Sequence, residues 1–486
     1  MNRSTSARVD RSAQLLDLVD EIGEWWSGSG PLYRQLATAV ARAIERGAVA
    51  HGARLPAERS MASAISVSRG TAVAAYDQLV GDGLVERRPG SGTFAVGPAA
   101  LALPVGREGS SLVARLVDRS AGPSDLIDLS ISVLHDAEGL PEAAVSTRDL
   151  LEVAPDTGYS PWGLPGLRSA VAELLGDWGL PTVPSQVVIT TGAQQAISIA
   201  AACWVRPGDR VVVDDPTYPG AVSAFTAAGA ELVAVPVDGG GMRVEPLAAA
   251  LENRPSLVYV QSALHSPSGA ALAAGRRPSI ARLAAQARVP LVEDVALAGL
   301  SWSALIPPIA ADAPRQPIAV VGSLSKLFWG GLRIGFVRAP EPVALRFARV
   351  KATHDLGSSA VSQLLAEQLL RAPDRATRVA SRNRELQHRY GALATSIQEA
   401  LPTWRWDEPA GGLSIWVRLP APVARELAVV ALRHRVAVAT ADALSAVVAQ
   451  PPGGHGDRIR LSFAAPVAEL QEGVRRLAEA WRTVVG

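Results

Sequence analysis

Apolar residues follow two different patterns along this chain. From about residue 125 onward, short runs rich in valine and isoleucine alternate with longer stretches rich in alanine and leucine. Short β-branched runs predict buried strands, and the longer stretches are typical of helices. The runs that predict strands are 186–190, 210–214, 231–237, 257–260, 290–295, 318–322 and 334–337. We therefore expect an α/β domain with a mostly parallel sheet over residues 125–486.

Residues 31–96 show the pattern of a smaller helical unit. Leu36, Val40 and Ile44 recur at helical spacing and predict the buried face of a helix that starts at the beginning of this unit. Before it, residues 1–30 form an N-terminal arm with one amphipathic stretch. After it, residues 97–124 are rich in Gly, Pro, Ala and Ser, which predicts a linker between two domains.

Two further helices are expected inside this unit, at 57–65 and 69–82, with a tight turn between them and Ser68 as N-cap of the second. The second helix has an expected apolar stripe of Val73, Tyr76 and Val80. Two short helices joined by a tight turn indicate a helix-turn-helix, which reads bases with the first residues of its second helix. Residues 85–96 then predict a hairpin wing.

The residues at the start of that second helix are Ser68, Arg69, Gly70 and Thr71. Arg69 is able to pair with the O6 and N7 atoms of guanine in the major groove. Gly70 allows the backbone to come close to a phosphate. The whole chain has a formal net charge of +1, so only the local excess of arginine in residues 31–96, eight against five acidic residues, favours nucleic acid.

Lysine occurs only twice in the chain, beside 45 arginines. Arginine holds its proton too tightly to act as an amine nucleophile, whereas lysine is able to lose its proton and condense with an aldehyde. Lys326 lies between Ser323, Ser325 and Arg333, groups that suit a phosphate. This segment therefore predicts a pyridoxal phosphate (PLP) lysine. The second lysine, Lys351, lies outside it.

Composition excludes several other classes of protein. Cys203 is the only cysteine, so neither an intrachain disulfide nor a cysteine-rich metal site is expected. The seven histidines show no metal-ligand spacing, and we expect no metal. No apolar run approaches the roughly 18 residues of a membrane span, and the N-terminus lacks the apolar stretch of a signal peptide. We expect a cytoplasmic protein that does not use a membrane.

The unit 31–96 resembles the winged helix-turn-helix of the GntR family. Three ordered blocks carry the resemblance: Leu-Pro-Ala-Glu-Arg, Val-Ser-Arg-Gly-Thr and Gly-Ser-Gly-Thr-Phe. The resemblance implies contacts with double-stranded DNA at Arg59, Arg69, Thr71, Gly90 and Gly92. We expect Arg54 to add a phosphate contact.

Residues 125–486 resemble the PLP-dependent enzymes of fold type I, the aspartate aminotransferase-like group. Ordered blocks at 159–168, 190–195, 215–219, 293–294, 323–335 and 458–462 carry this resemblance. It implies that Lys326 forms the Schiff base, that Asp294 pairs with the pyridinium nitrogen and that Tyr218 stacks on the ring. It implies a phosphate site made by Gly192, Ala193, Gln194, Ser323, Ser325, Arg333 and the neighbouring subunit's Tyr159. It also implies that Arg460 binds the carboxylate of an amino-acid effector.

A GntR-like unit joined to an aminotransferase-like domain resembles the MocR group of bacterial regulators. The resemblance implies a head-to-tail homodimer that binds an operator and responds to PLP or an amino acid. Two positions depart from the aminotransferase pattern. Ser266 stands where these enzymes usually have Asn, and no tyrosine follows Asp294, where Ala296 lies two residues on. Both side-chain donors to the 3-oxygen of PLP are therefore missing or weak, which disfavours efficient transamination.

Three functions remain open from the sequence. The first is a transcription regulator that senses PLP or a PLP–amino acid adduct. The second is an active aminotransferase with an accessory DNA-binding domain. The third is a DNA-binding scaffold whose large domain dimerises without a cofactor. The missing 3-oxygen donors favour the first over the second, with at most weak transamination.

Overall fold

The computed structural model describes most of the chain between Leu18 and Val485. The described residues are 18–19, 21–23, 25–26, 30–45, 48–49, 52–88, 90–96, 125–134, 140, 143–153, 157–302, 307–446 and 456–485. The expected linker, 97–124, and most of the N-terminal arm lie outside them.

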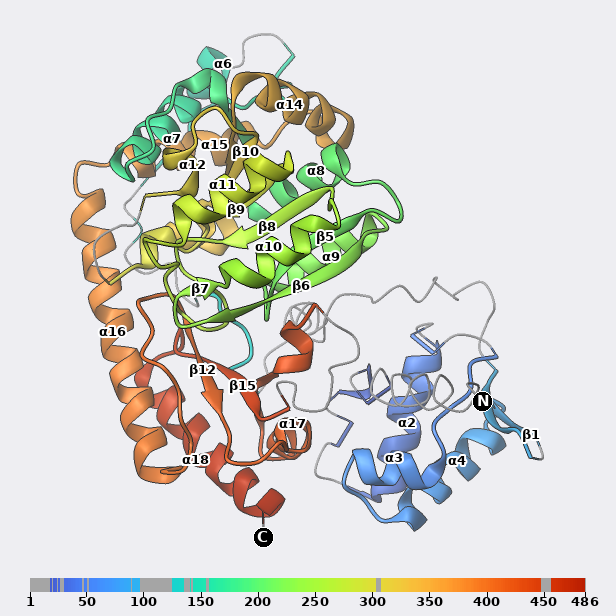
Figure 1. Ribbon diagram of the computed structural model, residues 1–486. Helices are drawn as coiled ribbons and strands as arrows, with labels where there is room; N and C mark the ends of the chain where they lie inside the picture. The colour runs from blue at the N-terminus through green and yellow to red at the C-terminus, as the bar shows by residue number, and fades with distance from the viewer. Residues whose placement is uncertain are drawn as a thin grey trace.

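The N-terminal unit folds as short helices followed by a hairpin, drawn in blue in Figure 1. Its elements are α2 (Leu32–Glu45), α3 (Glu58–Ala64), α4 (Arg69–Gly81), β1 (Val85–Arg88) and β2 (Gly92–Ala95). β1 and β2 pair antiparallel, with Val85 opposite Ala95. The Ser68 hydroxyl accepts a hydrogen bond from the Thr71 N–H at 3.1 Å. This bond confirms Ser68 as the N-cap of α4 and fixes where the second helix begins.

The buried face of α2 is the one that the sequence pattern predicted. Leu36, Val40 and Ile44 are all fully buried. The three residues pack in one cluster with Tyr76, whose hydroxyl donates to the Pro56 carbonyl at 2.9 Å. Tyr76 therefore joins α4 to the segment that leads into α3.

The expected stripe on α4 is wrong at two of its three positions. Val80 is 37% exposed and Val73 is only partly buried. The buried face of α4 consists of Ala72, Ala75, Tyr76 and Leu79. Two members of that face are alanines, which allow neighbouring helices to approach closely but give a weak apolar signal. A pattern search that weighs large side chains places the stripe about one residue away from where it lies.

The large domain is built on a mixed sheet with the strand order β4-β11-β10-β9-β8-β5-β6-β7. β10, β9, β8, β5 and β6 run parallel, whereas β11 is antiparallel to both of its neighbours. The strands are β4 (Val187–Thr190), β5 (Arg210–Asp215), β6 (Glu231–Asp238), β7 (Gly241–Met242), β8 (Leu257–Gln261), β9 (Leu291–Asp294), β10 (Ile318–Ser323) and β11 (Gly335–Arg338). Each of the seven predicted strands agrees with its observed range to within one residue at either end.

Helices cover both faces of this sheet, as the near-continuous apolar strands require. One face packs against α8 (Ala193–Trp204), α9 (Pro219–Ala227) and α14 (Glu341–Asp355). The other face packs against α7 (Pro165–Asp177), α10 (Val244–Glu252), α11 (Arg277–Ala287), α12 (Ile309–Asp312) and α15 (Ala360–Arg371). The remaining helices of this domain are α6 (Thr147–Val153), α13 (Leu324–Leu327) and the 3-10 turns η2 (Pro184–Gln186), η3 (Ala298–Leu300) and η4 (Gly330–Leu332).

A smaller C-terminal unit has a sheet in the order β12-β15-β14 and its own apolar core. The long helix α16 (Arg375–Ala400) runs along the side of the molecule from the large domain to this unit (Figure 1). The other elements are β12 (Ser414–Arg418), α17 (Ala424–Arg433), β13 (Val436–Ala437), β14 (Ala439–Thr440), η5 (Ala441–Leu444), β15 (Arg458–Ser462) and α18 (Val467–Val485). β3 (Ile127–Asp128) pairs parallel with β13, so the segment entering the large domain also belongs to this unit.

The N-terminal unit lies beside α17 (Figure 1). The guanidinium of Arg433, at the end of α17, donates to the carbonyl oxygens of Ile65 and Ser66 in the turn between α3 and α4. It also lies 6.0 Å from the centre of the Trp25 ring. Among the described helices, none is both long and apolar enough to cross a membrane.

The burial pattern of α4 generates a stability prediction. Leu79→Ala should lower the free energy of unfolding of the N-terminal unit by about 2–5 kcal/mol, because it leaves a cavity in a fully packed site. Val80→Ala, one residue on, should change it by no more than about 0.5 kcal/mol, because that side chain is half in solvent. Urea unfolding followed by far-UV circular dichroism measures both, and equal losses would contradict the observed face of α4.

Candidate functional site

Lys326 lies at the carboxyl edge of the parallel strands. β10 ends at Ser323, and Lys326 follows in the short helix α13. The neighbouring strands β9, β8 and β5 end at Asp294, Gln261 and Asp215. Open α/β sheets bind ligands at this edge, because the loops that leave the strands converge there.

The Lys326 amine donates to the Ser132 carbonyl at 2.5 Å. Burial and, to a smaller extent, the positive charge of Arg460 lower the pKa of Lys326, while Asp294 opposes them, and the net result is a pKa of about 8. A much larger fraction of the amine is therefore neutral near pH 7 than for an ordinary lysine. The hydroxyl of Ser132 is buried without a hydrogen-bond partner among the described residues, so a polar group is accommodated beside the amine.

Asp294 is held at the end of β9 by two hydrogen bonds. The Tyr259 hydroxyl donates to Oδ2 at 2.7 Å, and the Ala296 N–H donates to Oδ1 at 2.8 Å. Burial raises the pKa of Asp294, while these two bonds and Lys326 oppose the rise. A pyridinium nitrogen would supply the positive charge that a buried carboxylate requires, so this residue fits the role that the resemblance implies.

The start of α8, with the residues from Thr191 to Gln194, has the geometry that an anion would require, and we call it the anion loop. Gly192 precedes the helix with φ +121°, a conformation that favours glycine, and the N–H groups of Ala193 and Gln194 lie in the first turn. The Arg333 guanidinium donates to the Thr191 carbonyl at 2.8 Å. A Cβ added at Gly192 would lie 3.3 Å from Arg333 Nη2, so the arginine borders the loop directly.

The serines beside Lys326 adjoin this anion loop. The Ser323 hydroxyl accepts from the Ser325 N–H at 3.2 Å and caps α13. The Ser325 hydroxyl is buried and has no hydrogen-bond partner among the described residues. Gln194 donates to the Gly220 carbonyl at 2.8 Å, while its Oε1 likewise lacks a described partner. Orphaned buried polar atoms around Lys326 fit a bound polar ligand such as PLP.

Arg460 closes the other side of the site. Only 5% of the residue is exposed, and burial lowers the pKa of its guanidinium to about 10. It donates to the Ser130 carbonyl and, at 3.4 Å, to the hydroxyl of Ser266. Its Nε has no described partner, which leaves one N–H for a further acceptor. A buried arginine with a spare donor suits a carboxylate.

Tyr218 precedes α9 and lies near the same charges. Burial and the charge of Asp294 raise the pKa of its phenol, Arg333 and Arg460 oppose the rise, and the net result is a pKa of about 12. The predicted residues from five of the six sequence blocks therefore converge, and Tyr159, from the sixth, is the exception. Tyr159 is 67% exposed, and no contact described within one chain joins its ring to Lys326.

The sequence did not point to Tyr259 or Asp214. Both are fully buried inside apolar strand runs, where a single polar residue looks like part of the core. Asp214 accepts from the Gln261 N–H at 2.8 Å. Burial, opposed by the hydrogen bond from Gln261 and aided by the nearby charge of Asp294, raises the pKa of Asp214 to about 8. A polar residue in the middle of an otherwise apolar strand was the available signal.

The departures noted in the sequence are visible in the site. At position 296 the contact with Asp294 comes from the backbone, and the side chain is a methyl group. At position 266 the hydroxyl faces Arg460. Neither position supplies the amide or phenol of an ordinary aminotransferase.

All of the predicted DNA-contacting residues except Thr71 are exposed on the N-terminal unit. Arg59, Ser68, Arg69 and Gly70 are exposed at the starts of α3 and α4, and Thr71 is partly buried. The Thr71 hydroxyl lies 2.9 Å from that of Ser68. These positions leave Arg69 free to enter a groove of DNA.

Arg54 contacts the wing. The backbone of Arg54 forms an isolated antiparallel β-bridge with Phe94. A Cβ added at Gly92 would lie 2.7 Å from Nε of Arg54. Gly92 and Gly90 both have positive φ, at +114° and +72°. Glycine is therefore required here both for the backbone and, at Gly92, for the close approach of Arg54.

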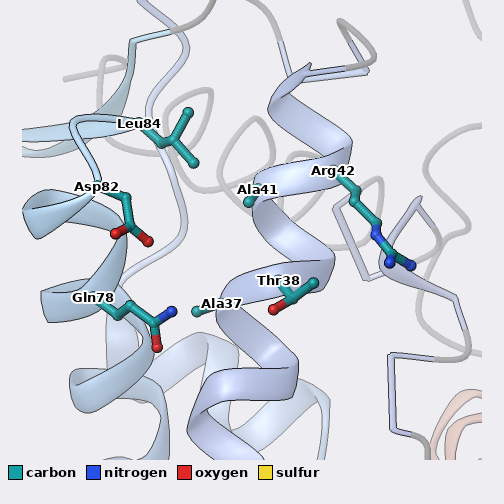
Figure 2. A pocket seen from close by; sticks show the side chains of 7 residues that line it. All are labelled: Ala37, Thr38, Ala41, Arg42, Gln78, Asp82 and Leu84. Atoms are coloured by element: carbon teal, nitrogen blue, oxygen red, sulfur yellow. The ribbon is translucent and has the colours of Figure 1, made fainter.

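A shallow hollow lies elsewhere on this unit, between α2 and α4 (Figure 2). Its lining includes Arg42, Gln78 and Asp82. The latter two follow the middle of α4, so the hollow is at the far end of that helix from Arg69. It is not part of the DNA-facing surface or of the Lys326 site.

Comparison with known proteins places both parts of the chain. Residues 124–477 match the family described as aminotransferase class I and II, and residues 32–95 match the gntR family of bacterial regulatory proteins. MocR of Rhizobium meliloti is 30% identical over 66% of this chain and 68% of its own length. The HTH-type pyridoxine biosynthesis transcriptional regulator PdxR of Corynebacterium glutamicum is 28% identical over 78% of this chain and 81% of its own.

Among solved structures, the chain resembles LysN, an α-aminoadipate aminotransferase from Thermus thermophilus in complex with N-(5'-phosphopyridoxyl)-L-leucine. The TM-score is 0.66 at 26% sequence identity, and the match covers 77% of this chain and 95% of LysN. The large-domain fold is thus that of an aminotransferase, while the winged helix is additional. The chain belongs to the aminotransferase class I and II family and carries a gntR-family DNA-binding domain at its N-terminus, the two-domain organisation of a MocR-type transcriptional regulator.

Proposed function

We propose that this regulator senses PLP, or a PLP–amino acid adduct, through its aminotransferase-like domain and changes its affinity for DNA in response. The observation that carries the proposal is the convergence of Lys326, Asp294, Arg460 and the anion loop at one sheet edge. PLP supplies an aldehyde for the amine and a pyridine ring that acts as an electron sink. In this proposal residues 31–96 bind the operator, 97–124 are the linker and 125–486 bind PLP.

Each part of the cofactor has a matching group in the chain. Lys326 offers an amine with a lowered pKa, and Asp294 offers a fixed carboxylate for the ring nitrogen. The loop at Gly192 and the Arg333 guanidinium would hold the phosphate. Arg460 would bind the carboxylate of an amino acid. PdxR, whose name places it in pyridoxine biosynthesis, and the phosphopyridoxyl complex of LysN support this ligand class.

A regulator is favoured over a working aminotransferase by the groups at positions 266 and 296. Transamination requires proton transfers whose rates depend on the ionisation of the 3-oxygen and the amine. Ser266 lies against Arg460, and Ala296 has no polar side chain. We therefore propose that the domain binds its ligand with at most slow turnover.

The dimer is part of the proposal. The exposed Tyr159 would serve the site of a second subunit, in a head-to-tail homodimer. Two winged helices held together bind two half-sites with greater avidity than one, because the second contact occurs at a high effective concentration. Since its target is bacterial DNA, we propose that the protein acts in the cytoplasm.

A chain of contacts connects the ligand site with the DNA-binding unit. The segment after β5 is tied to η5, where the Ser445 hydroxyl donates to Asp215 at 2.7 Å. Asp442 of η5 is paired with Arg425 at the start of α17. At the other end of α17, Arg433 donates to the carbonyls of the helix-turn-helix turn. A ligand that moves the segment after β5 would therefore shift α17 and the turn before the recognition helix.

The first prediction tests the cofactor. Lys326→Ala should abolish the visible absorbance that PLP gains when it joins a protein lysine. Lys351→Met should keep that absorbance when PLP is saturating, because Lys351 is paired with Asp355 and does not reach the site. Difference absorbance spectra recorded at saturating PLP measure both. A Lys351 variant that lost the absorbance while the Lys326 variant kept it would reverse the assignment.

The second prediction tests the DNA surface. Arg69→Ala should weaken binding to the cognate operator by about 1–3 kcal/mol and relax specificity at one base pair. Arg59→Ala should weaken binding to all sequences and flatten its salt dependence. Operators selected from bound genomic fragments, titrated by fluorescence anisotropy at two salt concentrations, give both quantities. Equal, sequence-blind losses would contradict the role of Arg69.

The third prediction tests the coupling. PLP should change the operator affinity or footprint of the wild-type protein, and Lys326→Ala should blunt the change, since a ligand acts only through different affinities for two states. Arg433→Ala should reduce the PLP response while leaving the affinity for PLP itself unchanged. Arg389→Ala, elsewhere in the C-terminal unit, is the control. Identical operator affinity and footprint with and without bound PLP in the wild type would contradict the sensor function. The large domain would then be only a dimerising scaffold for DNA binding.

A further inference from the structure

Lys351 is the second of the two lysines and is fully buried in α14. Its ammonium donates to both carboxylate oxygens of Asp355, one turn further along the helix, at 2.7 Å each. Taking an ammonium out of water is costly unless it is paired with good geometry. A chain that uses arginine at nearly every other basic position keeps a lysine here, where the compact ammonium fits beneath the carboxylate.

Asp355 connects the Lys351 ammonium to the anion loop through hydrogen bonds. Its Oδ2 accepts from Gln195 Nε2 at 2.7 Å, and Gln195 Oε1 in turn accepts from the Thr191 N–H at 2.9 Å. A carboxylate at one end and an N–H at the other leave the amide of Gln195 a single orientation. The carbonyl of Thr191 accepts a hydrogen bond from Arg333. The backbone of Thr191 is therefore held at its N–H by Gln195 and at its carbonyl by Arg333.

The same carboxylate also fixes the loop after α14. Asp355 Oδ1 accepts from the Gly357 N–H at 3.0 Å. Gly357 has φ +141°, and a Cβ there would lie 2.7 Å from the Ser160 carbonyl oxygen. Asp355 therefore holds the anion loop on one side and supports the segment next to Tyr159 on the other.

Lys351 matters because the charge of Asp355 has the same sign as that of a phosphate. A carboxylate two hydrogen bonds from an anion loop would repel a phosphate, because the interaction between like charges in a partly buried site is weakly screened. Burial raises the pKa of Asp355, but the hydrogen bonds from Lys351 and Gln195 outweigh it and hold that pKa below its usual value. The carboxylate is thus ionised, and the ammonium of Lys351 is the countercharge placed against it.

We propose that Lys351 is a positioning residue for the phosphate end of the ligand: it neutralises Asp355 and holds Gln195, so that the loop from Thr191 to Gln194 is set to receive a dianion. The residue does not touch the ligand and acts through Asp355 and Gln195. This inference rests on the proposed function, because it assumes that the loop binds the phosphate of PLP.

Pyridoxal, which lacks the phosphate, separates this role from a general effect on folding. With full-length protein freed of bound PLP, Lys351→Met should weaken PLP binding about tenfold, a loss of roughly 1.4 kcal/mol. Pyridoxal binding should change by less than about twofold, since that ligand makes no use of the loop. Titration of the visible absorbance gives both dissociation constants. Parallel losses for the two ligands would overturn the proposal and leave a structural role.

Two further variants test the route. Adding Asp355→Asn to Lys351→Met removes the uncompensated negative charge and should restore most of the PLP affinity. Gln195→Leu keeps the Lys351–Asp355 ion pair and removes the amide that links Asp355 to Thr191. It should also weaken PLP binding without affecting pyridoxal, so the proposal remains testable if the lysine variant folds poorly. A double variant no better than Lys351→Met, or a Gln195 variant with unchanged PLP affinity, would contradict it.

A matched control and the wild type complete the experiment. Arg389→Met removes a different ion pair one helical turn apart, between Arg389 and Glu385 in α16, in which the arginine side chain is 12% exposed. It should leave both affinities unchanged. Wild-type protein that binds neither PLP nor pyridoxal would overturn the proposed function itself. Wild type that binds PLP, together with a Lys351 variant that binds it equally well, would overturn the inference alone.

Discussion

Burial of ionised groups at one edge of the parallel sheet is the constraint on which the site depends. Asp294, Lys326 and Arg460 are each withdrawn from water at the point where the strand-end loops converge. Asp294 and Lys326 stabilise each other's charged forms, whereas the like charge of Arg460 lowers the pKa of Lys326. The arrangement keeps a lysine amine partly neutral and an arginine charged in the same small volume. A ligand with an aldehyde, a basic ring nitrogen and anionic ends complements it group by group.

The sequence predicted the elements whose signals are local. β-branched runs marked the strands to within a residue, and Ser68 marked the start of α4 by the chemistry of its hydroxyl. The face of α4 was missed because two of its buried residues are alanines. Family motifs predicted Lys326, whereas the partner of Asp294, Tyr259, became visible only when two strands were placed side by side. Contacts of this kind depend on which strands are neighbours, and no single stretch of sequence contains that information.

The two lysines show how composition and geometry combine. Nearly every cation of this protein is an arginine, whose planar group suits exposed pairs and phosphate. Lys326 is needed for an amine that releases its proton, and Lys351 for a compact, buried charge beneath a partly exposed carboxylate. The structure distinguishes these two uses, which the count of lysines alone does not. One lies at the reacting end of the site and the other behind its anion loop.

The contact made by Arg433 uses carbonyl oxygens of the helix-turn-helix turn and none of its side chains. Backbone atoms are present whatever residues occupy the turn and the start of the recognition helix. The side chains that read bases are thus free to change over evolution while the mechanical link to the large domain stays in place. DNA sequence specificity and the coupling to the large domain would then change independently. One sensor domain would acquire new target genes without any change in the contact made by Arg433.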